Sequence, residues 1–314
     1  MHLKPARTAA RAAAIGGVMV LGLGSATAAM ASPDAWQVPC NTNALFYALA
    51  NVDSGGTLIL AGGCTYYLPG SLVDGTDNLT IVGNGATLEG GGPNSDFAIL
   101  GVDCMEHLTL DGVSFTRGWA DDDGGAIDNS GYLTINGGVF SNNGGGEGGA
   151  IDSGGVDSSL TIHNAVFTRN SASDEGGAIA DDSDTTIVGA SFGDNNGYDG
   201  GALYVDGETT VVETSFLGNV GEYGGAIDNE DGLMLGNIEG VAGSGNTLEG
   251  NKADEGGGIY NDGGAYVEFS LIVSNEAHRG GGIYNTNCGD LLGLTGSTLY
   301  SNVTDNLYQE SGAC

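Results

Sequence analysis

The hexapeptide GGAIDN at residues 124–129 decides the fold, because close copies of it return through most of the chain. The copies read GGAIDS (148–153), GGAIAD (176–181), GGALYV (200–205), GGAIDN (224–229), GGGIYN (256–261) and GGGIYN (280–285). Their first glycines are 24, 28, 24, 24, 32 and 24 residues apart. A period of about 20 to 50 residues is typical of solenoids and propellers, in which each repeat packs against the next.

Two other motifs keep step with this hexapeptide. One has a large apolar residue, two spacers and Asn: FSNN (140–143), FTRN (167–170), FGDN (192–195), FLGN (216–219), LEGN (248–251), IVSN (272–275) and LYSN (299–302). The other reads LTI (133–135), LTI (160–162), TTI (185–187) and TTV (209–211). These alternating segments, rich in Ile, Val, Thr and Phe, indicate strands. A propeller blade would need four strands and about 40 residues. Three strands per repeat instead predict an all-β fold, a right-handed parallel β-helix of about ten three-strand coils.

Each repeated letter has an expected role. The Ile of the hexapeptide, replaced by Leu203 in one copy, should form an inward aliphatic stack, and the preceding Ala or Gly should point outward. The paired glycines should provide positive φ or a close backbone approach at a tight corner. The Asn of each F-x-x-N segment should hydrogen-bond to its copies in neighbouring coils. Four phenylalanines should stack inside: Phe140, Phe167, Phe192 and Phe216.

The ends of the chain differ from the repeats. Residues 1–31 are typical of a secretory signal peptide, with a basic start, an apolar run and an A-x-A-type cleavage site. The segment NTNALFYALANV (41–52) predicts a short amphipathic helix, capped by Asn or Thr, that would cover the first coil. We therefore expect a signal peptide (1–31), an N-terminal cap (32–56), a β-helix (57–302) and a C-terminal cap or tail (303–314). The 32-residue step contains about eight extra residues, expected as a loop near Gly236–Gly245.

Five cysteines suit an oxidising compartment. The sequence alone does not fix their connectivity. We expect one disulfide near each end, Cys40–Cys64 and Cys288–Cys314, with Cys104 left over and buried.

The charge balance excludes several classes of partner. Beyond the signal peptide, four basic residues stand against forty acidic ones. Such a surface repels phosphate backbones and anionic lipids, so we expect no nucleic acid partner and no binding to acidic membranes. No later segment is apolar enough to span a membrane as a helix. Cations are the natural partners.

The paired G-G-A-I and F-x-x-N motifs resemble the repeat of the polymorphic outer membrane protein family. The opening VPCNTNAL…GGTLILAGGCTYYL (38–68) resembles the start of bacterial secreted right-handed β-helix repeat proteins. Together the two resemblances cover nearly all of the chain after the signal peptide. The first implies display at the cell surface and adhesion, while fold alone does not establish function.

The residue before each glycine pair forms the first candidate site, a possible metal site. These residues are Asp123, Glu147, Glu175, Asp199, Tyr223, Glu255 and Arg279, and the neighbouring Asp121, Asp122, Asp174 and Asp254 add further charge. In stacked coils the five carboxylates would lie about 5 Å apart. Their repulsion can be relieved by raised pKa values or by bound Ca²⁺. The alternative is a solvated, solubilising edge.

The residue after each Ile forms a second candidate site, a binding face. These residues are Asp128, Asp152, Ala180, Tyr204, Asp228, Tyr260 and Tyr284. Beside a stripe of Ala and Gly they could form a smooth strip under a sugar chain, with rings stacking on Tyr and hydroxyls bonding to Asp. The alternative is a row of ordinary exposed strand residues.

A catalytic alternative rests on Arg117 with Asp121, Asp122 and Asp123. β-Helices host pectate lyases and glycoside hydrolases, and a hydrolase needs two carboxylates about 5 to 9.5 Å apart. The polygalacturonase motifs N-T-D, G-H-G and R-I-K are absent. With only four basic residues beyond the signal peptide, the protein would bind a polyanionic substrate poorly. We therefore expect a secreted or cell-surface, non-catalytic protein that adheres to a polysaccharide or another surface ligand.

Overall fold

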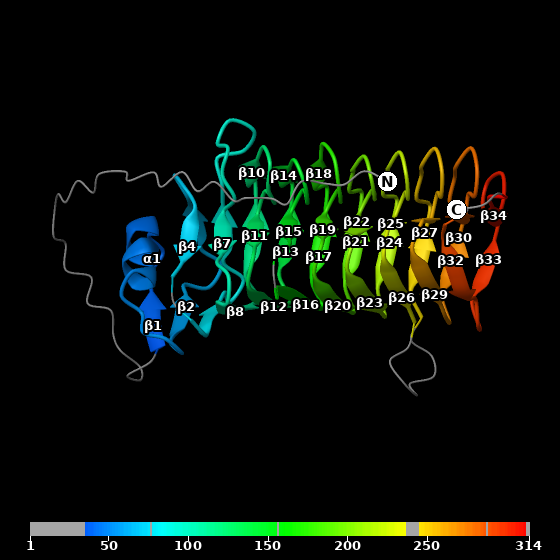
Figure 1. Ribbon diagram of the computed structural model, residues 1–314. Helices are drawn as coiled ribbons and strands as arrows, with labels where there is room; N and C mark the ends of the chain where they lie inside the picture. Colours follow the sequence, from blue (N-terminus) through cyan, green and yellow to red (C-terminus); the bar gives the residue numbers. More distant parts are fainter. Residues whose placement is uncertain (1–34, 76, 156, 237–244, 287, 312–314) are drawn as a thin grey trace.

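The computed structural model describes residues 35–75, 77–155, 157–236, 245–286 and 288–311. The chain winds into an elongated stack of coils, with the N-terminal coils at one end and the C-terminal coils at the other (Figure 1). Each coil adds one strand to each of three parallel sheets, A, B and C. The predicted all-β parallel β-helix of about ten coils is therefore confirmed.

Sheet A contains the LTI segments. Its strands, in spatial order, are β1 (Ala35–Val38), β2 (Thr57–Leu60), β5 (Leu79–Val82), β8 (His107–Asp111), β12 (Tyr132–Asn136), β16 (Ser159–His163), β20 (Asp184–Val188), β23 (Glu208–Val212), β26 (Gly232–Leu235), β29 (Gly264–Val267) and β32 (Asp290–Gly293).

Sheet B contains the phenylalanines. Its strands are β3 (Thr65–Tyr67), β6 (Thr87–Glu89), β9 (Ser114–Thr116), β13 (Val139–Ser141), β17 (Val166–Thr168), β21 (Ser191–Gly193), β24 (Ser215–Leu217), β27 (Thr247–Glu249), β30 (Leu271–Val273) and β33 (Thr298–Tyr300).

Sheet C contains the second half of each hexapeptide. Its strands are β4 (Leu72–Asp74), β7 (Leu100–Val102), β11 (Ile127–Asn129), β15 (Ile151–Ser153), β19 (Ile179–Asp181), β22 (Leu203–Val205), β25 (Ile227–Asn229), β28 (Ile259–Asn261), β31 (Ile283–Asn285) and β34 (Leu307–Gln309). A short sheet D lies along the loops between sheets B and C, with β10 (Trp119–Ala120), β14 (Gly144–Gly145) and β18 (Ser171–Ala172).

Each repeated residue pairs with its own copy one coil along, as in Ile127 with Ile151 and Phe140 with Phe167. The isoleucines of sheet C are fully buried. The four predicted phenylalanines stack inside with ring centroids 4.7–4.8 Å apart, and Phe115 extends their stack by one coil. In-register parallel pairing turns each sequence repeat into a continuous column of the core.

The predicted asparagine ladder is also present. Each side-chain amide donates to the Oδ1 of the next asparagine at 2.9–3.1 Å. The ladder runs through Asn143, Asn170, Asn195, Asn219, Asn251, Asn275 and Asn302. The same amides donate to backbone carbonyls, for example Asn195 to Phe167 O at 3.1 Å, so these buried groups are satisfied.

The glycine pairs have both expected roles. In six of the seven pairs the first glycine has positive φ, as at Gly176 (+59°), and Gly124 is the exception. The second glycine lies too close to the next coil for any side chain, since a Cβ on Gly177 would lie 2.1 Å from the carbonyl oxygen of Gly201. The pair therefore makes the corner and lets adjacent coils approach closely.

The alanines of the hexapeptide are not on the outer surface, so that prediction is wrong. Ala126, Ala150, Ala178, Ala202 and Ala226 are fully buried in the core. The backbone N–H groups of Ala126 and Ile127 both donate to the carbonyl of Ala150. Two consecutive N–H groups cannot point to one acceptor in an alternating strand, so the alanine still belongs to the corner. It turns inward beside the isoleucine.

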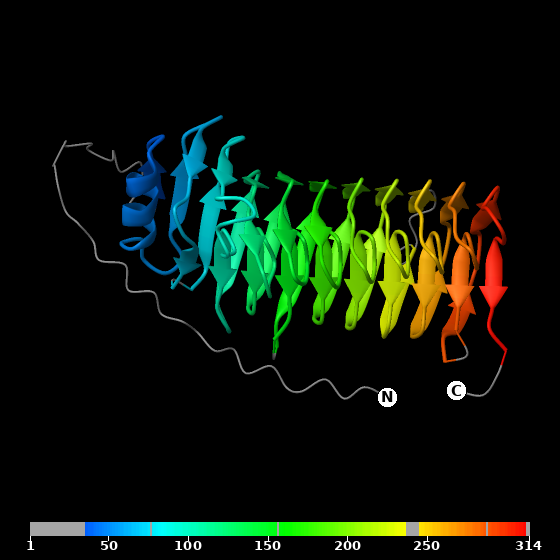
Figure 2. The ribbon, with the colours of Figure 1, turned by 90° about the horizontal axis from the view of Figure 1, so that it is seen from above.

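The predicted cap helix is confirmed at the N-terminal end. Helix α1 (Thr42–Leu49) begins after Asn41, whose side chain accepts from the Ala44 N–H at 3.1 Å. Leu45 and Ala48 are buried in the core. The helix lies at the end of the stack, beside the first coil (Figure 2).

The cysteine predictions have three outcomes. Cys40 and Cys64 form the expected disulfide, with a Cα–Cα distance of 5.6 Å. Cys104 is a free thiol but it is exposed, because it lies in the turn between β7 and β8, so the prediction that it is buried is wrong. Cys288 is disulfide-bonded, and Cys314 lies outside the described residues.

Two further predictions also fall outside the described residues, the signal peptide (1–31) and most of the extra loop (237–244). Within the described part of the chain, no helix has the length and apolar character needed to cross a membrane.

Candidate functional site

The residues before the glycine pairs lie side by side, as predicted. We call Asp123, Glu147, Glu175, Asp199, Tyr223, Glu255 and Arg279 the loop row. Parallel bridges join Glu175 to Asp199, Asp199 to Tyr223, Tyr223 to Glu255 and Glu255 to Arg279. The Gly148 N–H donates to the carbonyl of Glu175 at 2.8 Å, which places Glu147 next to it. The fold thus brings residues from successive repeats into one line.

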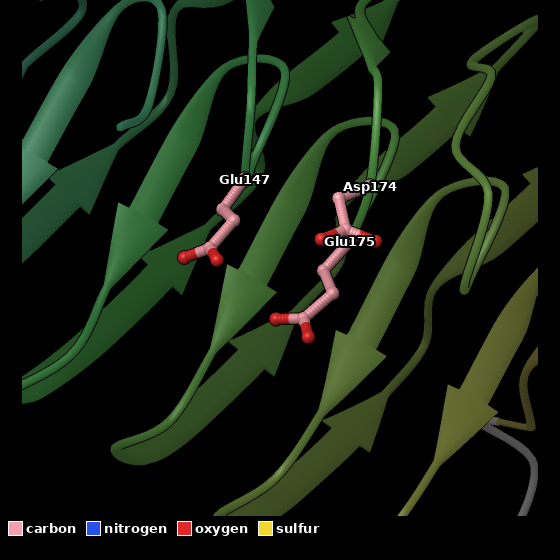
Figure 3. Close-up of side chains that lie close together, drawn as sticks. All are labelled: Glu147, Asp174 and Glu175. Carbon is pink, nitrogen blue, oxygen red and sulfur yellow. The ribbon is translucent and has the colours of Figure 1, made fainter. Parts of the chain in front are cut away.

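Three carboxylates converge where the loop row passes Glu147 and Glu175. Glu147, Asp174 and Glu175 each offer an oxygen, and these oxygens all lie within 4.8 Å of one another. Figure 3 shows Glu147 on one loop and the other two on the next, with the Glu147 and Glu175 carboxylates pointing the same way. Glu175 is buried, Glu147 is half-buried and Asp174 is exposed. Clustered carboxylate oxygens are the ligands that Ca²⁺ prefers. We call these residues the acidic triad.

Basic side chains contact carboxylates near the C-terminal end of the loop row. Arg279 pairs with Glu255. Lys252 pairs with Glu276 at 3.1 Å, and His278 lies 3.1 Å from Asp254. Of the five predicted metal ligands, only Glu147 and Glu175 join the triad. Asp174, which the sequence suggested as additional charge, supplies its third carboxylate.

The residues after each Ile do not form an open strip. We call Asp128, Asp152, Ala180, Tyr204, Asp228, Tyr260 and Tyr284 the strand row. Five are buried: Asp152, Ala180, Tyr204, Asp228 and Tyr284. Side chains of the loop row lie against them, as where Arg279 sits 5.4 Å from the ring centroid of Tyr284. The predicted smooth, exposed face is therefore wrong, because the loops cover it.

Tyrosines line the C-terminal half of this edge. The rings of Tyr260, Tyr284 and Tyr308 stack with centroids 5.3 and 5.0 Å apart. Tyr223 meets Tyr260 edge-on at 5.1 Å, and Tyr198 meets Tyr223 at 5.9 Å. Our sequence reasoning missed Tyr198 and Tyr308 as members of this cluster. Tyr308 could have been found, since LYQ (307–309) in the last coil copies the pattern of the IYN segments.

Burial shifts the ionisation of several groups on the edge. Burial raises the pKa of Asp228 well above its usual range, and the charges of Asp199 and Glu230 raise it further. Burial and the charge of Glu175 likewise raise the pKa of Tyr204. The loop row of one coil thus acts on the strand row of the next, and negative charge accumulates between them.

Asp181 is a further buried carboxylate that our sequence reasoning missed. It is fully buried at the end of β19, and its Oδ1 accepts hydrogen bonds from Ser183 and from Thr185 at 2.8 Å. Its Oδ2 accepts from Thr209 at 2.6 Å. Burial raises the pKa of Asp181 to about 6, although these hydrogen bonds lower it. The run of Ser and Thr after β19 is the only sequence signal for this network.

One family model matches the chain. It is the Chlamydia polymorphic membrane protein repeat, and it covers residues 164–181. This segment contains both FTRN (167–170) and GGAI (176–179), the two motifs that stack in sheet B and at the corner of sheet C. The chain is a β-helix protein with repeats like these. No curated protein and no solved structure shows a significant match to it.

Two residues of the catalytic alternative, Arg117 and Asp121, have contacts with residues outside the predicted set. Arg117 forms an ion pair with Glu89 at 3.4 Å. The Asp121 N–H donates to the side chain of Asp96 at 3.2 Å. A hollow of about 360 Å³ lies nearby, lined by Trp119, Ala120, Asp121, Gly145, Ser171, Ala172 and Ser173. Its lining contains a single carboxylate and no basic side chain, so it lacks an acid–base pair.

Proposed function

We propose that this chain is a secreted, surface-associated, non-catalytic β-helix protein that binds Ca²⁺ at its acidic triad and adheres to a polysaccharide or another cell-surface ligand. The repeat similarity and the fold support a surface-associated, non-enzymatic protein. The excess of acidic residues favours a role that needs cations.

The convergence of Glu147, Asp174 and Glu175 is the observation that carries the Ca²⁺ part of this proposal. Glu147 belongs to one coil, while Asp174 and Glu175 belong to the next. A bound Ca²⁺ would therefore cross-link two adjacent coils while it relieves the repulsion between the carboxylates. Its role would be structural, stiffening the loops of the outer edge.

Calcium-dependent thermal unfolding tests this site. Binding to the folded state alone stabilises it by about 2.7 kcal/mol at a hundredfold excess of ligand over Kd. We expect Ca²⁺ to raise the Tm of the wild type and EGTA to reverse the change. Glu147→Gln should abolish the part of the Ca²⁺-induced Tm shift that comes from the triad. The control Glu249→Gln, which changes an exposed glutamate on β27, should keep the full shift. An unchanged shift in Glu147→Gln would refute the triad as a Ca²⁺ site.

The adhesive part of the proposal rests on the tyrosine cluster. Tyr198 is 48% exposed at one end of it, and sugar rings stack on such aromatic faces. We expect insoluble polysaccharides to deplete the protein from solution without forming new reducing ends. Depletion should weaken in Tyr198→Ala and persist in Tyr47→Ala, an exposed tyrosine on α1. New reducing ends that disappear in Arg117→Ala or Asp123→Asn would instead make the chain a polysaccharide lyase or glycoside hydrolase.

A further inference from the structure

The hollow beside Trp119 lies on sheet D, whose middle strand has no side chains. Trp119 in β10 pairs with Gly144 in β14, and Gly144 pairs with Ser171 in β18. The three strands lie side by side in successive coils (Figure 1). Because β14 consists of Gly144 and Gly145, no side chain stands between those of β10 and β18. A hollow of about 360 Å³ remains there, which we call the Trp119 hollow.

The indole ring of Trp119 forms one wall of this hollow. A Cβ on Gly144 would lie 2.3 Å from a carbon of the ring, so only glycine leaves room for the ring at this place. In the following coils the same position holds Ser171 and then Asn196. The backbone of Trp119 is held from both sides, because its carbonyl also accepts from the Phe97 N–H at 2.7 Å. The half-buried ring is therefore fixed against the strand beneath it.

The opposite wall of the Trp119 hollow is polar. Ser171 and Ser173 line it from β18 and from the residue after that strand, and Asp121 follows β10. Each hydroxyl can both donate and accept a hydrogen bond, and the carboxylate accepts. The bottom is made of small, buried residues: Ala120, Gly145 and Ala172. The hollow thus combines an aromatic wall, a hydroxyl wall and an apolar bottom.

This lining favours a neutral sugar ring. The indole face and the small apolar residues suit the C–H face of a pyranose, while the serines and Asp121 can hydrogen-bond to its hydroxyls. No basic side chain lines the hollow, and the chain has a large excess of acidic residues, so phosphates, sulfates and uronic acids are disfavoured. The volume lies near the lower end of the about 300–1,000 Å³ typical of small-molecule sites, which suits a single ring.

The Trp119 hollow borders the aromatic surface on which adhesion was proposed. Asp174 directly follows Ser173, and its carbonyl accepts from the Tyr198 N–H at 2.8 Å. Tyr198 therefore lies one coil, or about 5 Å, beyond the serine wall, with its ring 48% exposed. A sugar chain that lies on Tyr198 is within one coil of the hollow.

We propose that the Trp119 hollow is a binding subsite for a neutral hexose, which stacks on the indole and hydrogen-bonds to Ser171, Ser173 and Asp121. The inference rests on the proposed function where it joins this subsite to a longer polysaccharide on Tyr198. It adds the class of sugar that the protein selects, and it places the selection at a walled hollow instead of an open tyrosine face.

Tryptophan fluorescence tests the subsite, because the chain has only two tryptophans. In Trp36→Phe, a conservative change in β1, all indole emission comes from Trp119. We would titrate this variant with the methyl glycosides of glucose, galactose, mannose and N-acetylglucosamine. We expect at least one to change the emission saturably, while sodium glucuronate and tetramethylammonium chloride leave it unchanged. No response to any glycoside, or a saturable response to tetramethylammonium alone, would overturn the proposal.

A serine variant distinguishes binding in the hollow from an effect elsewhere. Ser173→Ala removes one hydroxyl from the wall and should weaken glycoside binding roughly two- to tenfold. The matched control is Ser130→Ala, which changes a half-buried serine in the turn after β11 and should leave the affinity unchanged. Equal affinities in the two variants would contradict the assigned wall.

The same titration separates this subsite from adhesion to a polysaccharide. Glycosides that bind to a protein which no polysaccharide depletes would support the subsite and refute the adhesive function. Depletion by a polysaccharide, with Trp119 emission unchanged by every glycoside, would support adhesion and refute the subsite. Tyr198→Ala should weaken depletion without changing the affinity of the hollow for the glycoside.

Discussion

At the scale of single residues, the same amino acid at the same position of the repeat has different environments in different coils. Asp128 and Asp228 both belong to GGAIDN, yet one is half-buried and the other is buried among carboxylates. The difference comes from neighbouring coils, because Tyr204 and the loop of Asp199 flank only Asp228. Side-chain burial in a solenoid therefore depends on the coil before and the coil after.

Asp181 should make stability depend on pH. Its pKa is raised from 3.8 to about 6 in the folded state, so the folded state binds its proton more tightly than the unfolded state. This contribution is fully present below about pH 4 and is lost as the pH rises through 6, amounting to about 3 kcal/mol. Asp181→Asn should flatten this part of the profile in urea unfolding between pH 4 and pH 7. Asp184→Asn, an exposed change at the start of β20, should keep the wild-type slope.

Gly177 should tolerate no side chain. A Cβ there would lie 2.1 Å from the Gly201 carbonyl oxygen, which is a backbone atom and cannot rotate away as the end of a flexible side chain could. Gly177→Ala should therefore separate the two coils and lower the Tm by several degrees, which calorimetry can measure. At Gly193 a Cβ would meet its nearest atom, the Leu217 carbonyl oxygen, only at 3.9 Å. Gly193→Ala should accordingly be nearly neutral, and equal effects of the two changes would contradict this account.

At the scale of elements, the ladders of buried amides join the coils. A second ladder runs inside sheet C from Asn229 through Asn261 and Asn285 to Gln309. Asn229 is the first member of this ladder. Its Oδ1 lacks a hydrogen-bond partner because the residue paired with it in the coil before is Val205, whose side chain has no donor. Each ladder continues only where the next coil repeats the amide.

Asn195 tests how much the longer ladder contributes. Its side chain donates to Asn219 and to the Phe167 carbonyl, and it accepts from Asn170. Asn195→Ala leaves several buried partners unsatisfied, at about 1–3 kcal/mol each. We expect a large fall in the free energy of unfolding measured in urea. The neighbouring Asn196 is exposed, so Asn196→Ala should cost less than about 0.5 kcal/mol; a comparable loss would show that the ladder is not the cause.

At the scale of the whole molecule, α1 closes the N-terminal end of the stack (Figure 2). The Cys40–Cys64 disulfide joins the segments before and after this helix. The bond closes a loop between residues 24 apart, which predicts a stabilisation of about 3 kcal/mol. Cys40→Ser/Cys64→Ser should therefore unfold at a lower temperature. Because each coil contacts only its neighbours, hydrogen exchange should increase first in α1, β1 and β2. Uniform loss of protection along the stack would contradict this local role.

The repeat was sufficient to predict the coil, because an in-register parallel solenoid places each residue against its own copy. The columns of Ile, Phe and Asn, the two roles of the glycine pairs and the capping helix could all be predicted for that reason. Which side chains the loops cover could be seen only in the folded protein. Folding turned the hexapeptide alanines inward at a corner, buried most of the strand row and exposed Cys104 in a turn. It also brought Asp174 to Glu147 and Glu175, and enclosed Asp228 among carboxylates. Those outcomes depend on how the loops between sheets B and C fold over sheet C, and a repeat period contains no information about that path.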